Sequence, residues 1–60
     1  MNVFEIFKDR RGEYRWRLKA RNGEVVASSE GYTTKYSAQR SAQRVKEIAP
    51  RAFIKTLALI

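Results

Sequence analysis

The sequence predicts one α+β domain over residues 1–60, with the element order β-β-β-α-β and a second copy of the chain as its partner. Two patterns carry this prediction. Apolar side chains alternate with basic ones through residues 13–21, which is the period of a half-buried strand. Small and apolar residues recur every three or four positions through residues 38–49, which is the period of a helix with one buried face.

Three antiparallel strands are expected in the first half of the chain. The first covers residues 3–8, which are rich in β-branched and aromatic side chains, and a turn at residues 9–12 follows it. The second covers residues 13–21. The dipeptide Asn22-Gly23 is a strong hairpin signal and leads into a third strand at residues 25–29, so the three strands form a meander.

One helix and a last strand complete the predicted fold. Thr33 or Thr34 can cap the helix, because a threonine hydroxyl accepts a free N–H of the first turn. Pro50 ends it, since the proline ring clashes with the preceding turn. A fourth strand is expected at residues 52–60, which are apolar on both faces of an extended chain. The helix residues expected to pack inward are Ala38, Ser41, Ala42, Val45, Ile48 and Ala49.

The composition restricts the chemistry that the chain can carry. Its 60 residues include 13 Lys+Arg and 6 Asp+Glu, a net charge of +7, and neither Cys nor His. Disulfides and the usual zinc ligands are therefore missing, and we expect no metal and no cofactor. A domain of about 60 residues is only marginally stable alone. A partner subunit is the remaining source of stability, and we expect a homodimer.

An enzymatic role is not expected. Histidine, the usual general base, and cysteine, the best nucleophile, are both missing. Ser28 or Ser29 can be paired with Lys19 on paper, but nothing else in the sequence supports such a catalytic pair. Acidic side chains close to turns are typical of solvated surface positions. Those in this sequence are Asp9, Glu13 and Glu30.

Basic residues predict a surface that binds nucleic acid, either DNA or RNA, or another polyanion. Those of the second strand project from one of its faces, and arginine binds phosphate bidentately. Two alternatives remain open, a solvated outer face and a face that the partner covers in a dimer. Arg40 and Arg44 lie on the outward side of the helix, so the positive charge is spread over two sides of the domain. The residues assigned to this surface are Lys8, Arg10, Arg11, Arg15, Arg17, Lys19, Arg21, Arg40 and Arg44.

The aromatic residues of the second strand offer a different reading. Tyr14 and Trp16 could stack on nucleobases. They share a strand face with Leu18 and Ala20, however, so we expect them to lie in the core.

The apolar C-terminal segment predicts the dimer interface. A strand that is apolar on both faces would aggregate if it stayed exposed, so we expect it to complete a sheet across the dimer. A short membrane-contacting segment is the alternative, although no run approaches the roughly 20 residues needed to cross a bilayer. The assigned interface residues are Phe53, Ile54, Leu57, Leu59 and Ile60.

A cytoplasmic protein is the expectation for localisation. The first residues show neither a basic start nor the apolar run of a signal peptide. The lack of cysteine fits a reducing compartment.

Two runs of residues resemble a known family. Gly-Glu-Tyr-Arg-Trp-Arg-Leu at residues 12–18 and Ser-Glu-Gly-Tyr at residues 29–32 are similar to the YegP-like (UPF0339) family of small bacterial proteins of unknown function. The resemblance implies a β-β-β-α-β domain that occurs either as tandem copies or as a homodimer. The helix departs from the family pattern, because Ala42 stands where an apolar residue such as Ile is usual, and Arg40 and Arg44 add basic charge.

Overall fold

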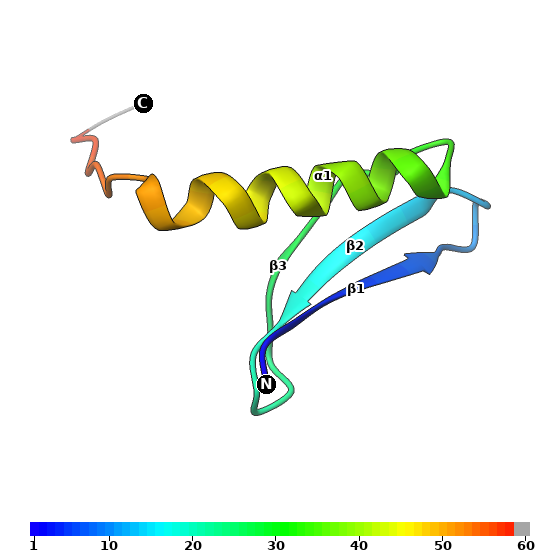
Figure 1. Cartoon of the computed structure of the whole chain (residues 1–60), viewed down its shortest axis with the longest axis horizontal. Helices are drawn as coiled ribbons and strands as arrows, with labels where there is room; N and C mark the ends of the chain where they lie inside the picture. The colour runs from blue at the N-terminus through cyan, green and yellow to red at the C-terminus, as the bar shows by residue number, and fades with distance from the viewer. Residues whose placement is uncertain (59–60) are drawn as a thin grey trace.

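The computed structural model describes residues 1–58 and shows a three-stranded antiparallel sheet with a helix across one face (Figure 1). The strands β1 (Val3–Lys8), β2 (Tyr14–Lys19) and β3 (Val25–Ser28) lie in the order β1-β2-β3. The predicted α+β class and meander are confirmed. Since β2 lies between its neighbours, β1 and β3 are the two edges of the sheet.

The register of β1 against β2 divides the sheet into an inner and an outer face. Ile6 lies opposite Trp16 and Phe4 opposite Leu18. Directly opposite residues of antiparallel strands share a face, and this face looks towards the helix. The next pair along, Glu5 and Arg17, therefore lies on the outer face of the sheet.

Both predicted turns contain a glycine in the left-handed region of backbone space. Gly12 has φ 84° and Gly23 has φ 92°, a conformation that glycine adopts without the steric cost of a Cβ atom. Strand β2 is shorter than predicted, because the N–H of Ala20 donates to the carbonyl of Glu24 at 2.8 Å and so belongs to the turn.

The helix α1 (Lys35–Ile48) begins and ends close to where the sequence predicts. Thr34 is the capping residue, and its hydroxyl oxygen accepts the N–H of Ser37 at 3.1 Å. A short 3-10 helix, η1 (Ala49–Arg51), follows directly and contains Pro50.

Small residues allow α1 to lie close to β2. Ala38 is 0% exposed, and Ala42 and Trp16 are each 6% exposed. The predicted inward stripe does not extend to the end of the helix, because Ile48 is 45% exposed and Ala49 is also exposed. Helix and sheet diverge towards the C-terminal end of α1, which extends past the strands (Figure 1).

The predicted fourth strand is wrong for the described part of its range. Residues 52–58 form neither strand nor helix. A strand needs a neighbouring chain to complete its hydrogen bonds, and α1 carries this segment away from both edges of the sheet (Figure 1). The last two residues of the predicted strand lie outside the described residues.

Candidate functional site

Arg17 of the predicted basic surface is bound within the sheet. Its Nε lies 2.7 Å from Oε1 of Glu5, the residue directly opposite on β1. Its Cζ lies 4.9 Å from the centroid of the Phe7 ring, so the guanidinium also makes a cation–π contact on the outer face. Arg17 thus has partners within the chain and serves the packing of β1 against β2.

Arg15, which lies two residues closer to the first turn on β2, also has partners within the chain. Its Nε lies 2.7 Å from Oδ2 of Asp9, and its Nη1 donates to the carbonyl of Ser29 at 2.9 Å. Oδ1 of Asp9 also accepts the backbone N–H groups of Arg11 and Glu13, each at 2.9 Å. Arg15 therefore links the first turn to the chain that follows β3.

These contacts lower the pKa values of two carboxyls. The hydrogen bond from Arg17 holds the pKa of Glu5 below its ordinary value of 4.5. The hydrogen bond from Arg15, with the N–H groups of Glu13 and Arg11, holds the pKa of Asp9 below 3.8. Each bond favours the charged form of the carboxyl.

We expect the protein to lose stability in acid because of these two carboxyls. A carboxyl whose pKa is lower in the folded state than in the unfolded state stabilises the fold at pH values above its unfolded pKa. This stability is lost as the pH falls through the pKa of the folded state. The melting temperature should therefore fall as the pH drops from 5 through 4.5 and then through 3.8. Thermal unfolding followed by circular dichroism measures this. The double variant Glu5→Gln and Asp9→Asn should be less stable at pH 7 and less sensitive to acid. An unchanged slope of melting temperature against pH in the double variant would contradict the assignment.

The other basic residues assigned to the sheet half lie at its two ends. Lys8 lies over the Tyr14 ring, with Nζ 5.7 Å from its centroid. Arg10 and Arg11 are exposed in the first turn. Lys19 is half-buried near the other end of β2, where its charge helps to lower the pKa of Glu5, and Arg21 is exposed in the second turn.

Arg40 and Arg44 lie on α1, in the other layer of the fold. Both are exposed. Neither makes an ion pair with any of residues 1–58, in contrast to Arg15 and Arg17. The arginines of the two layers therefore differ, since those of β2 are paired with carboxylates and, among the described residues, those of α1 are not.

The two aromatic residues of β2 differ in burial. Trp16 is buried, as predicted, with its ring edge-on to Phe4 at a centroid distance of 5.3 Å. Tyr14 is half-buried and pairs through its backbone with Tyr32. A base cannot stack on Trp16 in this structure.

Ser41 joins the helix to the sheet, a role that the sequence did not reveal. Its Oγ accepts the indole N–H of Trp16 at 2.8 Å and the hydroxyl of Tyr32 at 2.9 Å. The helical period placed Ser41 on the inward face, which was the available signal, but a period does not identify hydrogen-bond partners.

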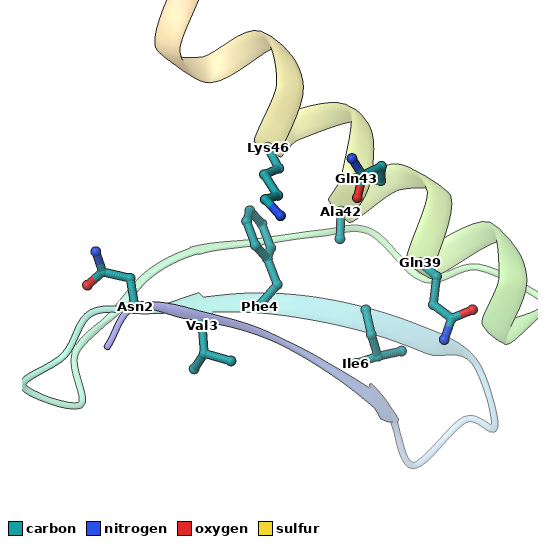
Figure 2. Close-up of a pocket in the computed structure, with 8 residues that line it drawn as sticks. All are labelled: Asn2, Val3, Phe4, Ile6, Gln39, Ala42, Gln43 and Lys46. Carbon is teal, nitrogen blue, oxygen red and sulfur yellow. The ribbon is translucent and has the colours of Figure 1, made fainter.

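A groove of about 350 Å³ opens between β1 and α1, where helix and sheet diverge. Figure 2 shows the Phe4 ring rising from β1 towards α1 and Lys46 reaching towards it from the helix. Both apolar and polar side chains line it, from the strand and from the helix (Figure 2). The lining residues are Asn2, Val3, Phe4, Ile6, Gln39, Ala42, Gln43 and Lys46.

The predicted interface residues that the structure describes are exposed. Phe53 is 98% exposed, Ile54 100% and Leu57 55%. Leu59 and Ile60 lie outside the described residues.

Ser29, one of the two serines paired with Lys19 on paper, uses its hydroxyl in hydrogen bonds within the chain. Oγ of Ser29 accepts the N–H of Trp16 at 2.9 Å and donates to the carbonyl of Glu30 at 2.8 Å. Among residues 1–58, no three metal-binding side chains gather in one place. Within the same range, no helix has the length and hydrophobicity that crossing a bilayer requires.

The fold defines a class of small α+β domains in which one helix covers a three-stranded meander. Solved structures of this class resemble the chain closely. A solution structure of a protein from Haloferax volcanii matches with a TM-score of 0.84 and 38% identity, over 93% of this chain and 95% of that one. A protein from Agrobacterium tumefaciens matches with a TM-score of 0.78 and 46% identity, over 95% of this chain and 92% of that one.

The chain belongs to the family described as a domain of unknown function, DUF1508, which matches residues 9–55. A UPF0339 protein from Neisseria meningitidis serogroup B is 48% identical over 52 residues, which is 87% of this chain and 93% of that protein. The resemblance to the UPF0339 family is therefore confirmed.

Proposed function

We propose that this chain is a non-enzymatic interaction module that acts as a homodimer. One observation carries the proposal: Phe53, Ile54 and Leu57 expose 98%, 100% and 55% of their surfaces within one short segment. Soluble proteins rarely leave such clusters of large apolar side chains in water, and a cluster of this kind marks an interface.

A second copy of the chain fits this segment. β1 is an edge of the described sheet, and the groove beside it is lined by Phe4 and Ile6 from β1 and by Ala42 from α1. Ala52 is extended, with φ −78° and ψ 140°. If the seven residues 52–58 took up an extended conformation on a partner, they would span about 23 Å, close to the length of a six-residue strand such as β1. The chain's own segment lies past the end of α1, away from that edge (Figure 1), so the proposed occupant is the segment of a partner.

The small core is an energetic reason to expect a dimer. Among residues 1–58, the buried hydrophobic side chains are those of Trp16, Ala38 and Ala42. A core of this size supplies little stability on its own, and oligomerisation is one of the ways in which small domains gain more.

The double variant Phe53→Ala and Leu57→Ala tests this proposal. Burial of one large apolar side chain is worth about 1.5–3 kcal/mol, so losing two should weaken the dimer at least tenfold. We expect sedimentation to show a dimer for the native chain and a loss of dimer for the variant. The melting temperature should fall as well, because the small core then stands alone.

A matched control removes apolar surface at the opposite edge. Val25 and Val26 of β3 are 51% and 54% exposed, so the variant Val25→Ala and Val26→Ala should remain a dimer. A native chain that is monomeric at millimolar concentration contradicts the proposal. So does a Phe53→Ala and Leu57→Ala variant that stays dimeric, or one that is a monomer with unchanged stability.

An uneven distribution of charge favours a second candidate function, binding of nucleic acid as a polyanion. Residues 35–58 carry six basic side chains and one acidic one, a net charge of +5 out of the total of +7. In the sheet half, Arg15 and Arg17 are paired with carboxylates. Polyanion binding is therefore better supported by the basic residues of α1 than by those of β2. Non-specific binders reach dissociation constants of about 10⁻⁴ to 10⁻⁶ M, and weaker binding of random-sequence nucleic acid at low salt would reject this candidate.

A further inference from the structure

A four-residue repeat builds one surface of α1. Ser-Ala-Gln-Arg occurs at residues 37–40 and again at residues 41–44. One turn of helix takes 3.6 residues, so like residues of the two copies stack in columns along the helix. The alanine column, Ala38 and Ala42, is buried against the sheet. The glutamine and arginine columns are exposed.

A tyrosine precedes the arginine column by one turn. Tyr36 is 66% exposed, so its ring is mostly in water rather than in the core. The guanidinium of Arg40 lies over this ring, with Cζ 5.8 Å from its centroid. We call the exposed surface formed by Tyr36, Gln39, Arg40, Gln43 and Arg44 the repeat face.

The charges of the repeat face are available to a ligand. The acidic residue of α1 is Glu47, and its Oε2 accepts the side-chain amide of Gln43 at 3.1 Å. Arg40 and Arg44 form no ion pair with residues 1–58. Together with Gln43 and Glu47 they line a shallow hollow on the helix, so one carboxylate shares this hollow with the two arginines.

We propose that the repeat face binds single-stranded nucleic acid, with a base on Tyr36 and phosphates on Arg40 and Arg44. The inference rests on the polyanion candidate above and specifies the kind of polyanion. Arginine binds phosphate bidentately, and an aromatic ring stacks on any base that is not already paired. Bases of a duplex stack on one another, so the ring of Tyr36 gives a reason to prefer a single strand.

The geometry of the column suits a flexible strand. Tyr36, Arg40 and Arg44 are each four residues apart, which places successive members about 6 Å apart along the helix axis. A single strand can adjust the separation of its phosphates to such a row, because base pairing does not fix its backbone.

Binding of a fluorescent 12-nucleotide random single strand, and of the same sequence as a duplex, tests the inference by anisotropy. We expect the full chain to bind the single strand more tightly. Arg40→Gln with Arg44→Gln should weaken this binding at least tenfold and should reduce the slope of log K against log salt by about 1.4 for two phosphate contacts. Tyr36→Leu should weaken single-strand binding about fivefold or more, with duplex binding unchanged.

A charge-matched control separates the repeat face from net charge. Arg10→Gln with Arg11→Gln removes the same charge from the exposed first turn, and it should weaken binding less than threefold. Three results would overturn the inference and leave the polyanion candidate standing. They are equal losses of affinity in the two double variants, equal affinity for duplex and single strand, and no effect of Tyr36→Leu. Displacement of the strand by an equal charge of polyglutamate would also overturn it, in favour of an acidic protein partner. Failure to bind either nucleic acid would reject both.

Discussion

Replacement of Trp16 by alanine should unfold the protein at 25 °C. The indole is 6% exposed, lies edge-on to the Phe4 ring at 5.3 Å and donates its N–H to Ser41 at 2.8 Å. Removing a large buried aromatic side chain costs about 3–5 kcal/mol. A core of this size rarely supplies more than about 3–5 kcal/mol in total, so the loss is comparable to the entire stability.

Circular dichroism with urea titration measures this effect, and a phenylalanine variant controls for it. Trp16→Phe keeps an aromatic ring in the core but loses the hydrogen bond to Ser41, worth about 1 kcal/mol. We expect it to fold cooperatively with a lower urea midpoint. If Trp16→Ala gave a cooperative transition within about 1 kcal/mol of the native chain, the central role of the indole would be wrong.

Replacement of Ala38 by leucine should separate the helix from the sheet. Ala38 is 0% exposed and faces the sheet, so a larger side chain has no space without displacement of α1. Overpacking of this kind typically costs about 1–3 kcal/mol. The melting temperature should fall by several degrees, and near-ultraviolet circular dichroism should report a changed environment of Trp16.

An exposed position on the same helix provides the comparison for Ala38. Lys35→Leu places a leucine at an exposed position in the first turn of α1 and should change stability by less than about 0.5 kcal/mol. Equal stability of the two leucine variants would contradict the close approach of α1 to the sheet.

The elements that depend on neighbouring residues in the chain could be predicted from the sequence. Alternation fixes which side of β2 faces inward, and Gly12 and Gly23 supply the positive φ that each turn needs. Thr34 caps α1 because its own hydroxyl reaches an N–H three residues away. In each case the cause and its effect lie within a few residues.

The features that depend on distant neighbours could not be predicted with the same success. The apolar pattern of residues 52–60 predicted a strand, but a pattern cannot supply the chain beside which a strand must lie. Alternation placed Arg15 and Arg17 on one strand face but could not show that each has a carboxylate partner within the chain. The hairpin register places Glu5 opposite Arg17, and counting outward from the first turn could have found that pair.

Ser41 also fixes the rotation of α1 about its own axis. The hydroxyl meets two donors that come from different segments, Trp16 on β2 and Tyr32 after β3. Turning the helix by one residue, about 100°, would break both hydrogen bonds and leave the buried indole N–H without an acceptor. The hydrogen bonds of Ser41, on the buried side of the helix, therefore determine the direction in which the repeat face points. A substitution at Ser41 should reorient that outer surface without touching any residue on it.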